Sequence, residues 1–225
     1  MRYPGGKGKT YQHIINLMPC HDVYIETHLG GGAVMRHKKP ATTNIGIDAD
    51  ASVLASWSQM PGINVDLVHG RAEDFLKTYP FTGGELLYVD PPYLPETRRR
   101  AKVYRCDYDV DDHVRLLHIL VSLPCMVLVS GYENALYDNT LQGWNKHTFQ
   151  AKTHVDVRVE TLWFNYEAPR LLHDSRYMGA NFRQRQDSKR RLERLKEKVC
   201  AMDPCERAAF TTWLYEAYPQ RELTP

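Results

Sequence analysis

The sequence has little that would place the protein in a membrane or outside the cell. No apolar run in its 225 residues approaches the roughly 20 residues that a membrane-spanning helix needs, and the N-terminus lacks the apolar segment of a secretory signal. The five cysteines are an odd number and form no C-x-x-C pair, so neither a disulfide framework nor a cysteine zinc site is indicated. We therefore expect a soluble, cytoplasmic protein that contacts no membrane and holds no metal.

A strong net charge is also missing, because 29 Lys and Arg against 27 Asp and Glu leave only +2. Basic residues are nevertheless concentrated in the segment 170–198, where ten Lys and Arg stand against four Asp and Glu. A second group lies in a segment at about 94–110 that we expect to be a loop, and a third lies near the N-terminus. Such clusters are typical of a protein that binds a polyanion, so we expect nucleic acid as the partner. The basic residues expected to contact it are Lys9, Arg98, Arg99, Arg100, Lys102, Arg105, Arg183 and Arg190.

Short apolar runs alternate with segments of helical composition over most of the chain. This alternation predicts a doubly wound α/β fold with a mostly parallel sheet and right-handed crossovers. Two later runs, 149–154 and 157–164, are separated by a short polar turn and predict an antiparallel pair at the sheet edge. The buried parallel strands are expected at 23–26, 44–48, 65–69, 86–90 and 126–130.

The composition changes after Pro169, where Arg, Gln and Lys become frequent. A helical period begins near Arg183, and Asp203-Pro204 then supplies an N-cap and a first-turn proline for another helix. We expect an α/β domain over residues 1–168, followed by a basic helical appendage over 169–225.

A glycine-rich segment, Glu26 to Gly32 (ETHLGGG), follows the first expected strand and precedes a helix. In α/β folds the backbone approaches a nucleotide-bearing cofactor at this place. Asp48 comes near the end of the next strand, where a carboxylate can accept hydrogen bonds from ribose hydroxyls. The dinucleotide motif G-x-G-x-x-G is incomplete, because Met35 stands where its third glycine would be, and the glycines at 5–8 fail the phosphate-loop pattern. These features indicate a nucleoside-bearing cofactor, with a tight turn and a helix N-cap as the alternative.

Asp90-Pro91-Pro92-Tyr93 is the strongest indication of chemistry in the sequence. It stands at the carboxyl end of the fourth expected strand, where open α/β sheets bind their ligands. The two prolines stiffen the turn, which holds a carboxylate, outward carbonyl groups and an aromatic ring together. A planar amino group could donate to two acceptors there while its ring stacks on Tyr93.

In their order and spacing these motifs resemble the Dam-like adenine-N6 DNA methyltransferases, particularly the short phage and prophage members. The resemblance covers about residues 1–166 and also includes Arg2 to Lys9, Asp74-Phe75, Val129 to Tyr132 and Glu160 to Asn165. It implies a Rossmann-like methyltransferase domain over 1–168 that transfers a methyl group from S-adenosylmethionine to the N6 of a flipped adenine, most often in double-stranded DNA. By this resemblance the catalytic residues are Asp90, Pro91, Pro92 and Tyr93. The cofactor-binding residues are Tyr3, Lys7, Glu26, His28, Gly30, Gly32, Asp48, Asp74, Phe75 and Asp90.

The chain departs from the family at two places. After Glu26 the family usually has Pro-Phe, whereas this chain has Thr27-His28, so the usual aromatic contact to the cofactor is either absent or made by His28. Asp74 and Asp90 are only sixteen positions apart, which leaves no room for the target-recognition insertion of Dam-like enzymes. Base reading must then come from the basic segment after the catalytic motif, from the C-terminal helices, or hardly at all. Two aromatic candidates for base contact are Tyr132 and Trp163, each with packing in the sheet as its alternative.

Other functions fit parts of the same sequence. The site could methylate adenine in RNA or the amino group of cytosine, and a silent homologue could keep the cofactor pocket only to bind nucleic acid. Pro-Cys occurs at Cys20, Cys125 and Cys205, but none of them follows the fourth strand, where the thiol of a carbon-5 cytosine methyltransferase should lie. Pairing with a restriction nuclease, phage self-protection and gene regulation would all use the same active site.

Overall fold

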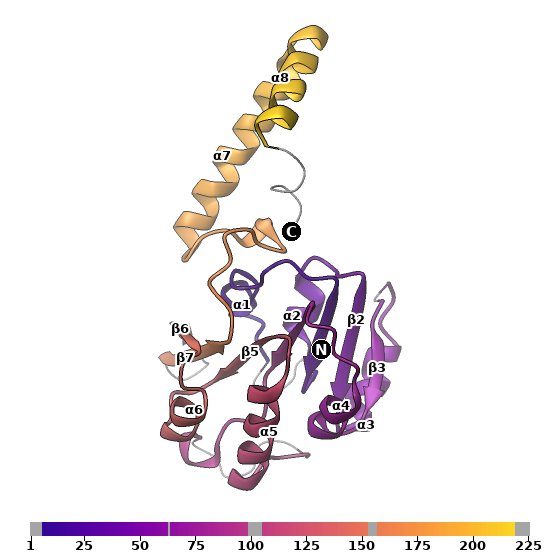
Figure 1. Cartoon of the computed structure of the whole chain (residues 1–225), viewed down its shortest axis with the longest axis vertical. Helices are drawn as coiled ribbons and strands as arrows, with labels where there is room; N and C mark the ends of the chain where they lie inside the picture. The colour runs from indigo at the N-terminus through magenta and orange to yellow at the C-terminus, as the bar shows by residue number, and fades with distance from the viewer. Residues whose placement is uncertain (1–5, 63, 99–104, 153–156, 219–225) are drawn as a thin grey trace. The chain divides into compact units, whose positions relative to one another are not determined.

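The computed structural model describes residues 6–62, 64–98, 105–152 and 157–218. The chain divides into two compact units. The sheet unit comprises Met1–Ile14 and His21–Ala168, and the helical unit comprises Ile15–Cys20 and Pro169–Pro225. Figure 1 shows the course of the chain through both.

The sheet unit contains one seven-stranded sheet with the order β3-β2-β1-β4-β5-β7-β6. The first five strands are parallel, and β7 runs antiparallel to both β5 and β6. This confirms the expected mixed α/β fold with an antiparallel edge pair, and the order 3-2-1-4-5 is the Rossmann arrangement, which reverses between β1 and β4. The strands are β1 (Val23–Thr27), β2 (Thr43–Asp48), β3 (Asp66–His69), β4 (Glu85–Val89), β5 (Met126–Gly131), β6 (Asn145–Lys152) and β7 (Val157–Phe164).

Short polar side chains begin the helices that connect these strands. Asp50 caps α3 by accepting from the Ser52 amide, and Asn134 caps α6 by accepting from the Tyr137 amide. Asp109 opens α5 with a capping box. The helices are α1 (Tyr11–Ile15), α2 (Ala33–His37), α3 (Ala51–Ser58), α4 (Ala72–Thr78), α5 (Val110–Ser122) and α6 (Ala135–Thr140), with a 3-10 turn at Pro95–Thr97.

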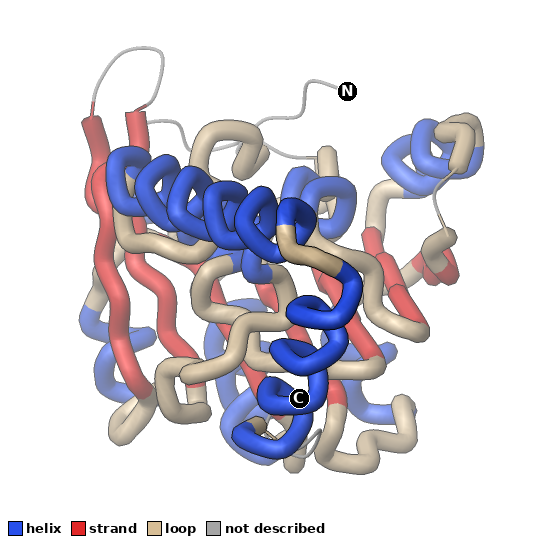
Figure 2. The backbone as a smooth tube through the Cα atoms, turned by 90° about the horizontal axis from the view of Figure 1, so that it is seen from above, coloured by secondary structure: helices blue, strands red, loops and turns tan. Residues whose placement is uncertain are grey.

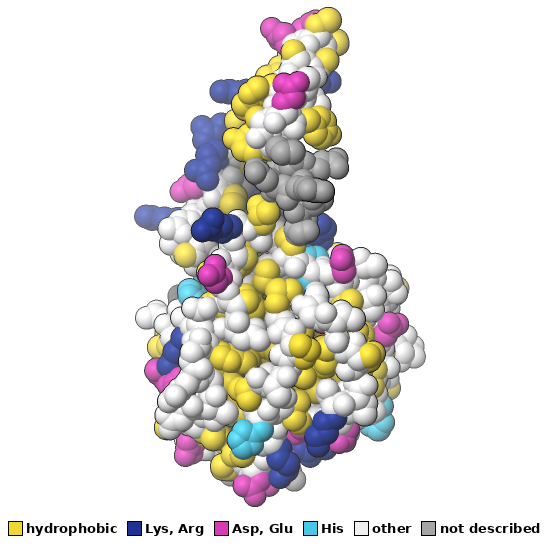
Figure 3. Space-filling view, in the orientation of Figure 1, with side chains coloured by type: hydrophobic (Ala, Val, Ile, Leu, Met, Phe, Trp, Pro, Cys, Tyr) yellow, Lys and Arg dark blue, Asp and Glu magenta, His cyan; other side chains and the backbone are white. Residues whose placement is uncertain are grey.

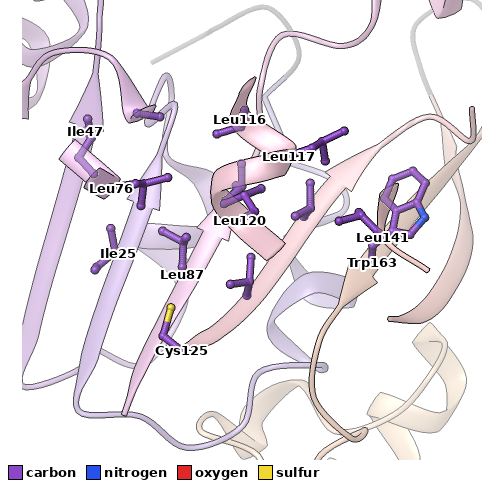
Figure 4. Close-up of a cluster of buried hydrophobic side chains, with 14 of the residues drawn as sticks. Ile25, Ile47, Leu76, Leu87, Leu116, Leu117, Leu120, Cys125, Leu141 and Trp163 are labelled. Atoms are coloured by element: carbon purple, nitrogen blue, oxygen red, sulfur yellow. The ribbon is translucent and has the colours of Figure 1, made fainter. Parts of the chain in front are cut away.

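One face of the sheet carries an apolar core, and the other carries polar side chains such as Glu26, Tyr88 and Ser130. Leu76 of α4, Leu116 and Leu120 of α5 and Leu141, just after α6, pack in this core (Figure 4). Successive strand residues point to opposite faces, so the residues between the core positions face away from it. The strand residues in the core are Ile25, Ile45, Ile47, Leu87, Val89, Val127, Val129 and Trp163.

The helical unit joins two segments that are distant in sequence. Pro19 and Leu172 form an antiparallel bridge, and the His173 amide donates to the Met18 carbonyl at 3.1 Å. After a 3-10 turn at Ser175–Tyr177 come α7 (Phe182–Ala201) and α8 (Pro204–Ala217), which Figure 2 shows as consecutive helices. The capping box predicted before α8 is confirmed, because Asp203 and Glu206 exchange their side-chain and backbone hydrogen bonds. The pairing of 15–20 with the segment after Pro169 is not predicted by the sequence.

Candidate active site

A cleft opens in the sheet unit at the carboxyl ends of the parallel strands. Its lining comes from the segments that follow β1, β2, β3 and β4, the elements on either side of the point where strand order reverses. Ligands of doubly wound sheets bind at this position. The lining residues fall in 6–7, 28–34, 47–50, 70–72 and 90–93, with Glu26, Cys106 and Tyr108.

The loop after β1 is held in a conformation that requires glycine. Gly30 and Gly32 have φ values of 45° and 49°, in the left-handed region that favours glycine. A Cβ atom on Gly32 would lie 2.1 Å from the Trp57 ring. The Trp57 indole donates to the Gly30 carbonyl at 2.9 Å, so the tryptophan both fills the space beside the loop and fixes it.

Asp48 ties this loop to the end of β2. One carboxylate oxygen accepts from the Gly30 amide and the other from the Asp50 amide, each at 2.8 Å. Burial raises the pKa of Asp48, and the two amides oppose that rise. Each oxygen of a carboxylate can accept a second hydrogen bond, so Asp48 can shape the loop and still accept from a ligand in the cleft.

Glu26 lies at the floor of the cleft and is only 3% exposed. Its Oε2 atom accepts from the Tyr24 hydroxyl at 2.9 Å and from the Met35 amide at 3.0 Å. Burial raises the pKa of Glu26 to about 8, with a smaller contribution from the charge of Asp90. A cationic group in the cleft would favour its ionised form.

Asp90 is the centre of a buried hydrogen-bonded network. The Lys7 ammonium lies 2.7 and 2.8 Å from its two oxygens, and the Ser130 hydroxyl donates to Oδ1 at 2.7 Å. Tyr88 extends the network, since its hydroxyl lies 3.1 Å from that of Ser130. Burial lowers the pKa of Lys7, but the charges of Asp90 and Glu160 outweigh it and raise the pKa above its ordinary value. Lys7 is thus a charged partner of the catalytic motif, beyond the cofactor contact that the resemblance implies.

Tyr93 lies near residues that come from β7 and from the position just after the end of β5. Its ring meets that of Tyr132 edge-on at 4.6 Å, and Arg158 lies over the Tyr132 ring at 5.0 Å. The Lys7 ammonium is 4.9 Å from the Tyr93 centroid and 4.0 Å from Oε2 of Glu160. The structure therefore places Tyr132 beside the catalytic motif, whereas Glu160 reaches the same cluster without having been predicted as a site residue.

The segment after β3 contributes different residues from those expected. Asp74 is exposed on α4, and Phe75 stacks on Tyr79 at 5.1 Å and packs against the core, so neither lines the cleft. Arg71 lies there instead, with its guanidinium 4.9 Å from the centre of the Tyr108 ring. The first turn of a helix presents its earliest residues to the strand ends, which is why 70–72 reach the cleft and 74–75 do not.

Tyr108 also explains the position of His28. The two rings meet edge-on at 5.1 Å, and the Tyr108 hydroxyl donates to Glu73 at 2.8 Å. Burial lowers the pKa of His28 to about 4, so its imidazole is neutral. Its φ is 60°, in the left-handed region that side chains other than glycine rarely adopt.

Two residues expected to contact nucleic acid are largely buried and have partners within the sheet unit. Trp163 is 2% exposed in the core, and its indole donates to Asp138 at 2.9 Å. Arg98 donates to both oxygens of Asp107 at 2.8 Å, with its side chain 7% exposed. Trp163 thus packs in the core, the alternative to base contact, and Arg98 forms an ion pair with Asp107, while its contact with phosphate stays a prediction.

The other predicted residues take varied places. Pro91 and Pro92 line the cleft with the rest of their motif. Lys9, Arg105, Arg183 and Arg190 are exposed. Tyr3, Arg99, Arg100 and Lys102 lie outside the described residues. Of the Pro-Cys thiols, Cys125 is buried, which raises its pKa to about 12, and none of the three lines the cleft.

The described part of the chain contains neither a candidate metal site nor a candidate membrane-spanning helix. Within it, no three or more His, Cys, Asp or Glu side chains are grouped so that they could hold a metal ion. Its helices likewise include none that is long and apolar enough to cross a membrane.

Comparison with known proteins gives only a structural likeness. The sequence matches no protein-family model and no curated protein. Among solved structures, an rRNA methylase from Streptococcus thermophilus has a TM-score of 0.48 at 11% identity over 68% of this chain and 92% of that one. TrmK of M. capricolum, solved with S-adenosyl-homocysteine, scores 0.47 at 6% identity over 92% and 93%. Magnesium protoporphyrin IX methyltransferase from Synechocystis, solved with its cofactor, scores 0.46 at 11% identity over 69% and 78%.

Proposed function

We propose that this chain is an S-adenosylmethionine-dependent methyltransferase that methylates the N6 amino group of adenine in DNA. The observation that carries the proposal is that Asp90 to Tyr93 lines the same cleft as the Gly30–Gly32 loop and Asp48. A motif able to hold a planar amino group and a loop able to hold a nucleoside thus face one space. The resemblance in motif order from Arg2 to Asn165 favours adenine in DNA as the target.

The polar groups in the cleft fit this cofactor. Asp48 would accept from the ribose hydroxyls, and the buried Glu26 carboxylate would pair with the ammonium of the methionine part. His28 lines the cleft, and its Nε2 is a buried atom with no hydrogen-bond partner in the described chain. A bound ligand would satisfy it. Arg71 and Tyr108, in place of Asp74 and Phe75, would border the adenine of the cofactor.

The residues of the catalytic motif would act mainly by positioning and charge. The cofactor supplies an electrophilic methyl group on a sulfonium sulfur. Asp90 and the Pro91 carbonyl would accept the two hydrogens of the target amino group, which draws its nitrogen toward tetrahedral geometry. Tyr93 would stack on the flipped base and hold it in line. The nitrogen lone pair forms the new bond to carbon while the carbon–sulfur pair returns to sulfur, and the methylated nitrogen then loses its proton to water.

DNA would be held by exposed cations outside this cleft. Arg105 and Lys9 in the sheet unit and the basic helix α7 offer exposed cationic side chains. Contacts of this type are made mainly to phosphates and fix the position of the duplex. They predict an affinity that falls steeply with salt.

Methyl transfer from labelled S-adenosylmethionine tests the proposal directly. Unmethylated duplex DNA, single-stranded DNA and RNA would be offered in parallel, and the products digested to nucleosides. We expect N6-methyladenine from DNA. Label only in RNA or in cytosine would keep the methyltransferase and change its target, and cofactor binding without transfer would favour the silent nucleic-acid binder.

A further inference from the structure

The contacts of Lys7 pose a problem for the catalytic role of Asp90. In this structure the Asp90 carboxylate accepts the Lys7 ammonium on both oxygens and the Ser130 hydroxyl on Oδ1. A target amino group needs one of these oxygens at short range. Each carboxylate oxygen can accept two hydrogen bonds, and Oδ1 already accepts from Lys7 and Ser130, so an incoming amino group has to share Oδ2 with the ammonium or displace it.

A second carboxylate lies within reach of the same ammonium. Oε2 of Glu160, on β7, is 4.0 Å from Lys7 Nζ, and the Glu160 side chain is 12% exposed. This oxygen is buried and has no hydrogen-bond partner in the described chain. The Tyr93 hydroxyl also hydrogen-bonds to the Glu160 side chain, and a short movement of the ammonium would bring it within hydrogen-bond distance of Oε2.

We propose that Glu160 is a positioning residue that receives the Lys7 ammonium when the target amino group takes its place on Asp90. The movement is short, because Nζ is already within 4.0 Å of Oε2, and the lysine stem is flexible. No bond forms or breaks and no proton moves, since the ammonium only exchanges one carboxylate for another. The inference rests on the proposed function, because it assumes that an amino group enters at Asp90.

The buried position of Lys7 makes such a second partner necessary. Its side chain is 4% exposed, and a buried charge that loses its partner is strongly destabilised. With Glu160 present, the ammonium remains paired both before and after the base enters. The charge of Lys7 and the Tyr93 hydroxyl also act on Glu160, opposing the rise of its pKa that burial causes. From β7, Glu160 thus interacts with Lys7, the partner of Asp90, and with Tyr93. Asp90 and Tyr93 are the first and last residues of the catalytic motif.

A double-mutant cycle tests the exchange. Glu160→Gln keeps the shape but removes the charge, and we expect kcat to fall about 100-fold with unchanged cofactor affinity. Lys7→Met removes the ammonium, and adding Glu160→Gln to it should then cost little further activity. Glu160→Asp should recover part of kcat. The control is Glu167→Gln, at an exposed position of the same unit, which should behave as the unchanged protein.

The outcomes separate the exchange from the proposed function. Equal losses from Glu160→Gln with and without Lys7 would show a merely structural role and overturn the exchange, as would an unaffected kcat, while methyl transfer by the unchanged protein still stood. Absence of transfer by the unchanged protein would overturn both. A crystal structure with S-adenosylhomocysteine and adenosine gives a readout that needs no variant. It should place Lys7 Nζ within hydrogen-bond distance of Glu160, and an ammonium still on both Asp90 oxygens would contradict the exchange.

Discussion

In the sheet unit Lys7, Glu26 and Asp48 are 4%, 3% and 7% exposed, whereas none of the described residues of α7 or α8 is buried. The sheet unit therefore holds these buried charges in place through partners, whereas most Lys and Arg side chains of α7 and α8 are exposed. In Figure 3 the Lys and Arg side chains of the helical unit stand beside apolar ones, and Phe182 and Trp213 are 69% and 53% exposed. Paired, buried charge suits chemistry on one small group, and exposed charge suits contact with an extended polyanion.

Removing the central buried carboxylate should give the largest effect. We expect Asp90→Ala to lower kcat by about 1,000-fold or more, because the acceptor that acts on the amino nitrogen is lost, while cofactor binding persists. Single-turnover transfer and calorimetric titration of S-adenosylmethionine measure the two properties. Asp66→Ala, at an exposed strand position, is the control. Substantial turnover by the Asp90 variant would defeat the proposed mechanism.

The segment after the catalytic motif contains one arginine that is paired and nearly buried and another that is exposed. Arg98 is paired with Asp107 and nearly buried, so Arg98→Gln should lower the free energy of unfolding by about 3 kcal/mol with little change in DNA affinity. Arg105 is exposed, so Arg105→Gln should leave stability unchanged and weaken DNA binding slightly. Urea unfolding and a DNA titration at fixed salt measure the two. The reverse assignment would mean that Arg98 leaves Asp107 to contact DNA.

The buried acid Glu26 should make stability depend on pH. Its pKa rises from 4.5 to about 8 on folding because of burial. Between these values the folded protein keeps a proton that the unfolded chain releases, so this contribution to stability is present below pH 4.5 and is lost as pH rises through about 8. Glu26→Gln removes the titration, and its stability relative to the unchanged protein should grow by up to about 1.4 kcal/mol per pH unit in that window.

Thermal or urea unfolding from pH 5 to 9 measures this difference without the cofactor. The same variant should bind S-adenosylmethionine more weakly at pH 8, because it lacks the charge that pairs with the ammonium. A difference in stability that stays constant with pH would show that Glu26 is already ionised at pH 5.

The sheet was predictable from sequence because its strands are short buried runs that end in chemically distinctive residues. Asp90, Glu26 and Asp48 could be placed at one end of a parallel sheet from that pattern alone. The alternation of side chains along a strand also predicts the face on which Trp163 lies. Trp163 pairs with Val129 in the structure, and Leu162 pairs with Ser130. Residues 129 and 163 therefore share the core face, whereas 130, 160 and 162 share the opposite one.

What sequence reasoning missed depends on contacts between distant segments. Lys7 lies 83 positions from Asp90 and Arg98 lies nine from Asp107, and nothing in a run of basic residues says which of them will find a carboxylate. Arg71 lines the cleft and Asp74 does not, because α4 begins at Ala72. Sequence patterns locate the first residue of a helix only approximately. The pairing of 15–20 with the chain after Pro169 likewise has no local signal.

The smallest expected effect concerns the exposed charges of α7. Arg183 and Arg190 are both exposed there, so Arg183→Gln with Arg190→Gln should weaken DNA binding about tenfold at low salt and reduce the slope of log affinity against log salt by about 2. Neither stability nor kcat at saturating DNA should change, since these side chains touch neither the core nor the cleft. Lys39→Gln with Lys77→Gln, two exposed lysines of the sheet unit, is the matched control. If both double variants lower affinity alike, net charge alone governs binding; if neither does, α7 is only a solvated helix, and the contrast between the two units carries no information about where DNA binds.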